Sequence, residues 1–149
     1  AEVSLSLNTQ EATKITKIEQ KYTKDKSPIN ADVKEMLKIF KEYVKDVVVI
    51  TDGKKGAYAF DGKTFYYAPT FPSKRISTLG AGDAFASTFT AYFIKYNDIE
   101  KALKAASINS ASVVTDFSAQ KGLLTEEKIK EKFEKSDKYH DYKVQKFDE

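Results

Sequence analysis

The spacing of apolar residues changes several times along the chain, and each spacing predicts a different element. Apolar and polar residues alternate over 3–7, which predicts a strand with one covered face. The continuous β-branched run over 47–50 predicts a strand that is covered on both faces, as in a parallel sheet. Two further short strands are predicted over 57–60 and 64–67, and Asp61-Gly62 between them is typical of a tight hairpin turn.

Helical spacing separates these strands. Asn8 with Glu11 three positions later has the spacing of a capping box, and it predicts a helix that runs through Ala12, Ile15 and Ile18–Glu19. The clearest amphipathic stripe follows Asn30 and consists of Val33, Met36, Leu37, Phe40, Tyr43 and Val44. Because strands and helices alternate, the sequence predicts an α/β fold.

Three more helices are predicted in the second half of the chain. The first follows a glycine-rich turn and has an aromatic face that we expect in the core, made of Phe85, Phe89, Tyr92, Phe93 and Tyr96. The second begins after Asp98, and its apolar face consists of Ile99, Ala102, Leu103, Ala106 and Val113. The third begins after Thr125, with Ile129 and Phe133 facing inward. The polar tail over 137–149 contains a weak final strand, predicted from Tyr142, Val144 and Phe147.

The composition limits the class of protein. The 149 residues correspond to about one domain, and the absence of Cys excludes disulfides, thiolate metal sites and Cys nucleophiles. The one His, His140, argues against a His-based metal site or a Ser-His-Asp triad. A net charge of +3 is too small for a nucleic-acid binder. Without an apolar run of about 18 residues or a basic leader, we expect a cytoplasmic protein with no membrane partner.

The stretch from Gly80 to Asp83 has a pattern that suits chemistry on an anion. Two glycines let the backbone approach a ligand closely, and the helix that follows leaves unpaired N–H groups that favour negative charge. A carboxylate beside such a site suits phosphoryl transfer, with Asp83 accepting the proton of the attacking hydroxyl. A plain glycine turn, in which Asp83 only favours the helix dipole, produces the same pattern.

This stretch, Gly80-Ala81-Gly82-Asp83-Ala84-Phe85, resembles the second signature of the ribokinase (PfkB) family of carbohydrate and nucleoside kinases. Two more motifs occur in the order found in that family. The segment Thr51-Asp52-Gly53-Lys54-Lys55-Gly56 is similar to its T-x-G-x-x-G turn, and Asn8-Thr9-Gln10-Glu11 resembles its N-x-x-E motif. The resemblance implies an α/β fold that is the C-terminal half of a ribokinase-like three-layer α/β/α sandwich.

The resemblance also implies a role for each matched residue. Asp83 would be the catalytic base, and an anion hole would be formed by the backbone amides of Gly80, Ala81 and Gly82. The nucleotide would contact Thr51, Gly53, Gly56, Asn109 and Gly122. Asn8 and Glu11 would help to order Mg²⁺, so the implied cofactors are ATP and Mg²⁺. The implied acceptor is a hydroxyl of a small-molecule sugar or nucleoside.

Local structure gives alternative explanations for several of these residues. A helix cap explains Asn8 and Glu11, an ordinary turn explains 51–56, and packing of a small-residue helix explains Asn109. Ser77 stands where many family members have an Asp that helps to hold a monovalent cation. The resemblance therefore does not extend to activation by potassium.

A full family member is implied to be roughly twice as long as this chain, with most of the sugar pocket in its N-terminal half. We therefore expect residues 1–149 to be a nucleotide-binding and catalytic portion from which that half is absent. Because its strands would lose neighbours, we expect it to self-associate or to pack against the absent half. Two other functions stay open: a non-catalytic nucleotide- or phosphate-binding fragment, and a hydroxymethylpyrimidine-type kinase of the same fold.

Overall fold

The structure is a computed structural model. It describes residues 2–18, 27–70, 81–113, 125–135 and 142–148. The contacts between Cα atoms divide the chain into two compact units. One is formed by Ala1–Tyr67 with Gln145–Glu149, and the other by Ala68–Val144.

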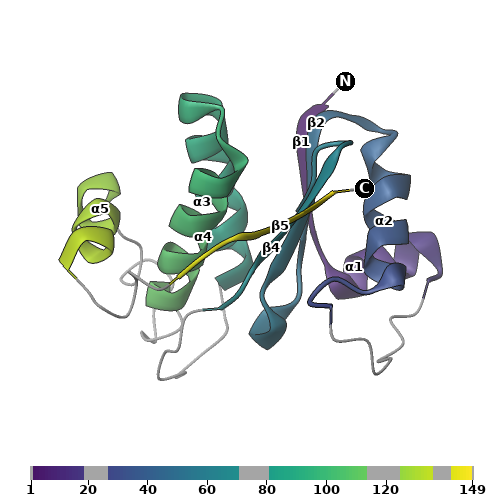
Figure 1. Ribbon diagram of the computed structural model, residues 1–149, viewed down its shortest axis with the longest axis horizontal. Helices are drawn as coiled ribbons and strands as arrows, with labels where there is room; N and C mark the ends of the chain where they lie inside the picture. Colours follow the sequence, from purple (N-terminus) through teal and green to yellow (C-terminus); the bar gives the residue numbers. More distant parts are fainter. Residues whose placement is uncertain (1, 19–26, 71–80, 114–124, 136–141, 149) are drawn as a thin grey trace. The chain divides into compact units, whose positions relative to one another are not determined.

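The first unit is built on a mixed sheet with the strand order β1-β2-β3-β4-β5 (Figure 1). Its strands are β1 (Glu2–Asn8), β2 (Val44–Thr51), β3 (Ala57–Phe60), β4 (Thr64–Ala68) and β5 (Gln145–Asp148). β1 and β2 run parallel, whereas β3 is antiparallel to β2, and β5 is antiparallel to β4. The four strands predicted from the first half of the chain are confirmed, and so is the α/β class.

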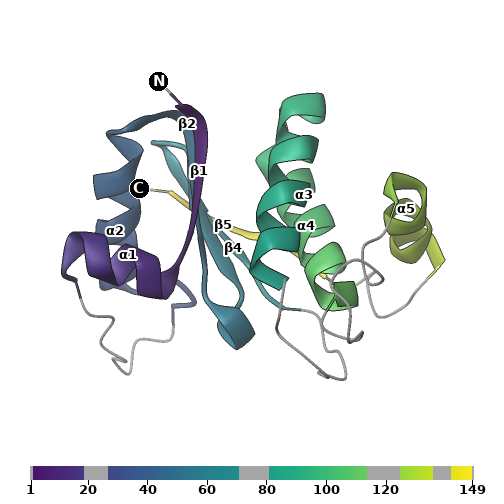
Figure 2. The ribbon, with the colours of Figure 1, turned by 180° about the vertical axis from the view of Figure 1, so that it is seen from behind.

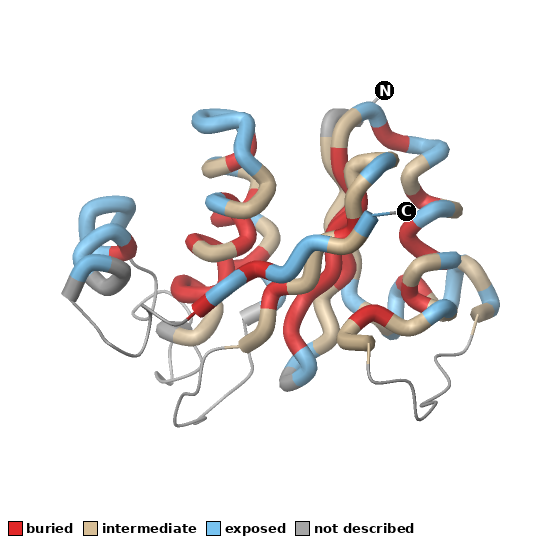
Figure 3. The backbone as a smooth tube through the Cα atoms, in the orientation of Figure 1, coloured by how far each residue is buried: buried red, intermediate tan, exposed pale blue. Residues whose placement is uncertain are grey.

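Two helices of this unit, α1 (Thr9–Thr16) and α2 (Ala31–Lys41), lie on one face of the sheet (Figures 1 and 2). α2 begins where the sequence predicts, since the side chain of Asn30 accepts a hydrogen bond from the backbone N–H of Val33 at 2.9 Å. Its buried side chains pack on β2, β3 and β4, and Figure 3 shows the buried residues gathered where α2 faces the sheet. That core comprises Ala12, Ile29, Val33, Met36, Leu37, Phe40, Val44, Val48, Ile50, Tyr58, Phe60 and Phe65.

The hairpin between β3 and β4 forms as its Asp-Gly signal predicts. Gly62 has a φ of 98°, a conformation that favours glycine. The Asp61 carboxylate accepts hydrogen bonds from the backbone N–H groups of Lys63 and Thr64 at 2.9 and 2.8 Å. The turn is therefore fixed by local contacts alone.

Two helix ends differ from the predictions. α1 ends at Thr16 because Lys17 adopts a left-handed conformation, with a φ of 62°, and donates its N–H to the Thr13 carbonyl. Ile18 therefore lies outside the helix. α2 ends at Lys41, so the last two positions of its predicted stripe are wrong: Tyr43 is 73% exposed and Val44 begins β2.

The last strand is displaced within the predicted tail. β5 contains Phe147, whereas Tyr142 and Val144 precede it and are buried. The Tyr142 hydroxyl donates to Ser107 Oγ at 2.9 Å, so a specific side-chain contact replaces the predicted strand pairing at that position.

The described residues of the second unit form three helices, α3 (Ala81–Tyr96), α4 (Ile99–Val113) and α5 (Glu126–Lys135). α3 and α4 lie side by side in both views and are joined by only two residues, of which Asp98 accepts the N–H of Lys101 (Figures 1 and 2). α5 is capped by Thr125, as predicted. The buried faces confirm the predicted positions of Phe85, Phe89, Phe93, Ala102, Leu103, Ala106 and Ile129.

The aromatic face of α3 is shorter than predicted. Tyr92 is half-buried and Tyr96 is 37% exposed, so the buried aromatic stripe ends at Phe93. A tyrosine hydroxyl needs a polar partner, and Tyr96 finds one outside the core in Glu126. The side chains of Val113 and Phe133 lie outside the described residues.

Candidate functional site

Two of the three motifs lie at one edge of the sheet. β1 and β2 are parallel, and Asn8 at the end of β1 pairs in register with Thr51 at the end of β2. The carboxyl ends of these strands therefore meet at the same edge, which is where open α/β sheets bind ligands. The Thr51 hydroxyl strengthens this end of the ladder by donating to the Leu7 carbonyl at 3.4 Å.

The N-x-x-E segment forms a complete capping box. Asn8 Oδ1 accepts the N–H of Glu11 at 2.8 Å, and Glu11 Oε1 accepts the N–H of Asn8 at 3.0 Å. Both side chains are exposed. The cap is a sufficient structural reason for both residues, and the exposed Glu11 carboxylate has the hard oxygen atoms that Mg²⁺ prefers.

The T-x-G-x-x-G segment is a tight turn between β2 and β3. A short 3₁₀ helix, η1 (Gly53–Lys55), lies at its centre, and the Asp52 N–H donates to the Gly56 carbonyl at 2.8 Å. Gly53 and Gly56 have φ values of 53° and 104°, which only glycine adopts at little cost. The turn itself therefore requires both glycines.

One carboxylate links this turn to its surroundings. Asp52 accepts hydrogen bonds from the hydroxyls of Thr9 at 3.3 Å and Tyr58 at 2.9 Å. The Tyr67 hydroxyl donates to the Lys55 carbonyl at 2.6 Å. The pKa of Tyr67 is raised by burial and, to a smaller extent, by the negative charge of Asp52.

Sequence reasoning missed Asp52, Tyr58 and Tyr67 as members of this cluster. Asp52 occupies a variable position of the motif, and the two tyrosines looked like ordinary strand residues. One signal in the sequence could have indicated this cluster. A polar residue stands inside a tight turn, and tyrosines follow it on two neighbouring strands. The geometry adds these three residues to the sheet edge formed by Asn8 and Thr51.

The third motif begins α3 in the second unit. Gly82 and Asp83 are exposed in the first turn of the helix. Gly82 has an ordinary negative φ, and a Cβ added there would have no atom within 4 Å. Local structure therefore does not require glycine at 82, and open space remains for an incoming group. Gly80 lies outside the described residues, as does Gly122.

Asn109 lies inside the helix pair. It is 5% exposed, and its Nδ2 donates to the Thr88 hydroxyl of α3 at 2.7 Å. This contact is the packing role that a polar residue on a small-residue helix takes when it is buried.

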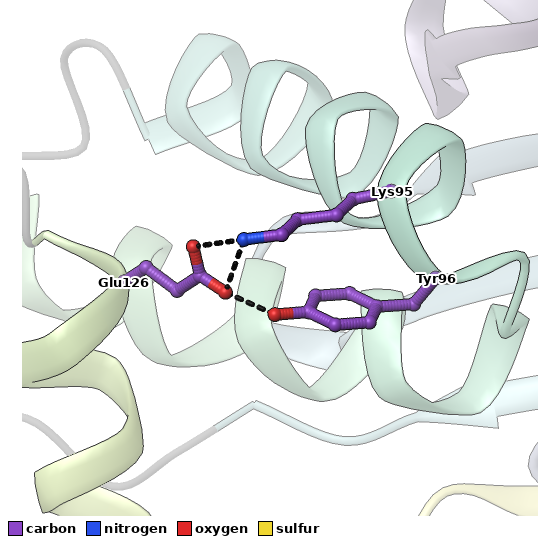
Figure 4. Close-up of polar contacts among 3 residues, drawn as sticks. All are labelled: Lys95, Tyr96 and Glu126. Carbon is purple, nitrogen blue, oxygen red and sulfur yellow. Dashed lines mark hydrogen bonds and ion pairs between the residues drawn. The ribbon is translucent and has the colours of Figure 1, made fainter.

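A different polar cluster lies between α3 and α5 (Figure 4). The Lys95 ammonium lies 2.8 Å from the Glu126 carboxylate, which also accepts the Tyr96 hydroxyl. These hydrogen bonds lower the pKa of Glu126 and raise that of Lys95. A pocket of about 420 Å³ lies beside the cluster, lined by Tyr92, Tyr96, Lys101, Lys104, Glu126 and Ile129 among others. Sequence patterns gave no sign of it, because it depends on where α5 packs.

The described parts of the chain contain no group of three or more His, Asp or Glu side chains placed to hold a metal ion. Among the described helices, none combines the length and the apolarity needed to cross a bilayer.

Comparison with known proteins identifies the family. The chain belongs to the pfkB family of carbohydrate kinases, whose model matches residues 4–126. It is 37% identical over 91 residues to the 5-dehydro-2-deoxygluconokinase of Bacillus subtilis (strain 168), a match that covers 60% of this chain and 28% of that protein. The chain thus spans less than a third of the length of this curated relative.

Solved structures of two kinases share the fold of this chain. The Arabidopsis thaliana ribokinase complexed with ribose and ATP is similar with a TM-score of 0.76 at 19% identity, over 90% of this chain and 41% of that one. A putative ribokinase II from E. coli in complex with ATP and Mg²⁺ has a TM-score of 0.70 at 17% identity, over 89% and 39%. The prediction of a ribokinase-like α/β fold is confirmed.

Proposed function

We propose that this chain supplies the nucleotide site and the catalytic base for ATP-dependent phosphorylation of a carbohydrate hydroxyl. The observation that carries the proposal is the register of the parallel strands, which brings the N-x-x-E and T-x-G-x-x-G segments to one sheet edge. Membership of the pfkB family of carbohydrate kinases and the similarity to the B. subtilis 5-dehydro-2-deoxygluconokinase favour a sugar over a nucleoside as acceptor.

The nucleotide contacts are proposed residue by residue. Thr51, Gly53 and Gly56 contact the nucleotide through the turn that closes β2. Asn109 and Gly122 are proposed to border the base. Asn109 would do so from a side chain already fixed by Thr88, which keeps it in one orientation.

The proposed chemical step takes place at the start of α3. The acceptor hydroxyl oxygen forms a bond to the γ-phosphorus of ATP, the bond from that phosphorus to the bridging oxygen breaks, and ADP leaves. Asp83 takes the hydroxyl proton, while the N–H groups of Gly80, Ala81 and Gly82 stabilise charge on the transferred group. The exposed position of Asp83 and the open space at Gly82 support these roles.

Asn8 and Glu11 are proposed to act on Mg²⁺ indirectly. Asn8 Oδ1 and Glu11 Oε1 already accept the hydrogen bonds of the capping box, so the two residues order water around the ion rather than bind it as a pair. When bound, Mg²⁺ neutralises phosphate charge during the transfer. The oxygen-only donor set at this edge fits that ion.

The partial coverage of the relatives favours one alternative, a fragment that binds nucleotide without turnover. Incubation of the polypeptide, as the cell makes it, with MgATP and a panel of sugars separates the possibilities. We expect a phosphorylated sugar together with ADP. Nucleotide binding without any phosphorylated sugar would support the alternative, and no binding at all would contradict both.

A further inference from the structure

Asp52 connects two segments that are far apart in the sequence. It stands between Thr51 and Gly53 in the T-x-G-x-x-G turn, and its Oδ1 accepts the hydroxyl of Thr9 at 3.3 Å. Thr9 is the second residue of the N-x-x-E segment and the first of α1. One side chain therefore joins the two motifs beyond the point where the strand ladder ends at Asn8 and Thr51.

The same carboxylate is anchored to the core of the sheet. Its Oδ2 accepts the hydroxyl of Tyr58 at 2.9 Å, and Tyr58 is 3% exposed on β3. At the other end of the turn, the Tyr67 hydroxyl donates to the Lys55 carbonyl, and the rings of the two tyrosines lie 5.7 Å apart. The turn is thus braced at both ends by neighbouring aromatic side chains.

Asp61 provides a natural comparison within the same sheet. It also lies in a tight turn and accepts two backbone N–H groups and a tyrosine hydroxyl, that of Tyr66 at 3.4 Å. These donors all lie within five residues of Asp61 in its own hairpin. Asp61 therefore stabilises one turn, whereas Asp52 fixes one segment relative to another.

We propose that Asp52 is a positioning residue of the nucleotide site, which holds the start of α1 and the 52–56 turn in the arrangement that binds MgATP. This role rests on the proposed function. A pre-arranged site binds its ligand more tightly, because less conformational freedom is lost on binding. Asp52 acts through Thr9 and the turn, so its removal is expected to weaken nucleotide affinity more than it weakens the fold.

Calorimetric titration of the chain with MgATP tests the role, with thermal unfolding of each variant measured in parallel. For Asp52→Ala we expect about a tenfold rise in Kd, the loss expected from one or two hydrogen bonds to a charged group. The matched control Asp61→Ala should lower the unfolding midpoint at least as much as Asp52→Ala does. Its Kd should stay within about twofold of the wild-type value.

A second pair of variants isolates the link between the motifs. Thr9→Val removes the hydroxyl and is expected to raise Kd, whereas Thr9→Ser keeps the hydroxyl and should restore wild-type affinity. Hydrogen exchange of the unliganded chain adds a readout that needs no nucleotide: Asp52→Ala should speed exchange in 9–12 and 53–56 together.

The outcomes separate this role from the proposed function. If wild type does not bind MgATP, both are wrong. If wild type binds and Asp52→Ala binds equally well, the positioning role is wrong and the proposed function stands. Equal losses of affinity in Asp52→Ala and Asp61→Ala would show a general effect of stability and would also overturn the role.

Discussion

Asp52 and Glu126 both accept a tyrosine hydroxyl, but the surroundings of the two carboxylates differ. Asp52 accepts the hydroxyl of the buried Tyr58 at an edge where two motifs meet. Glu126 accepts the hydroxyl of Tyr96 and the ammonium of Lys95, with the Lys95 and Glu126 side chains 59% and 46% exposed. The second cluster contains an ion pair and has the clearer shifts of pKa, yet none of its residues belongs to a motif.

The difference shows what identifies a site in this protein. Exposed ion pairs are screened by water and contribute little, so strong local hydrogen bonding at Glu126 is not evidence of function. The sheet edge is identified by topology instead, since parallel register brings Asn8 and Thr51 together at the carboxyl ends of two strands. The predictions below test this contrast.

The largest expected effect is at Asp83. Replacing Asp83 by Asn should lower kcat by orders of magnitude and leave ATP binding largely intact, because the hydroxyl proton loses its acceptor. Asp98→Asn is the matched control, since Asp98 also lies at a helix start in the same unit and only caps that helix. Steady-state kinetics on both variants checks this, and near-normal turnover in Asp83→Asn would refute its role as base.

A smaller effect is expected at the tyrosines. Tyr58→Phe removes a hydrogen bond from a buried hydroxyl to a carboxylate, and it should lower the free energy of unfolding by about 1 to 2 kcal/mol. Tyr96→Phe removes a hydrogen bond at an exposed site, so it should lower the free energy of unfolding by less. Urea denaturation of the two variants gives the comparison, and a larger loss for Tyr96→Phe would reverse it.

Alkaline pH should lower the stability of both regions, because each region contains a half-buried tyrosine. Burial is the main cause that raises the pKa of Tyr67 and Tyr92 above 10.0 in the folded chain, and nearby carboxylates add to it. The folded state then holds these protons more tightly than the unfolded state. The stabilisation is complete below pH 10 and is lost as the pH rises through the folded-state pKa values. Stability measured against pH should decline less steeply above pH 10 in Tyr67→Phe and in Tyr92→Phe, and an unchanged slope would contradict this.

The smallest effect is expected for the Lys95–Glu126 pair. Glu126→Gln removes the charge that faces Lys95, and the unfolding midpoint should move only slightly and only at low salt. Nucleotide affinity should not change. Thermal unfolding at low and high salt provides the measurement. A large shift of the unfolding midpoint that persists at high salt would contradict this and would show that the pair stabilises the fold.

Local signals in the sequence predicted most of the first unit. Asn8, Asn30 and Asp61 each cap a turn or helix within three residues, so short-range chemistry determines where those elements begin. The end of α1 escaped prediction because Lys17 adopts a left-handed conformation that its residue type does not favour.

The candidate site was predicted only in part, for a related reason. Motif spacing led to Asn8, Glu11, Thr51 and Asp83, but Asp52 matters through Thr9, which lies 43 positions away. Such a contact depends on the register between β1 and β2, which one sequence does not state. The exposure of Tyr96 likewise depends on where α5 packs, not on the spacing within α3.

The central claim is that MgATP binds at the motif-bearing edge and not at the more strongly hydrogen-bonded cluster. Backbone amide NMR spectra of the ¹⁵N-labelled chain, recorded during titration with MgATP, test it directly. The account predicts saturable shifts at 8–11, 51–56 and 81–83, with 95–101 and 126–130 unchanged. Saturable shifts confined to 95–101 and 126–130 would contradict it and would place the nucleotide in the pocket between α3, α4 and α5.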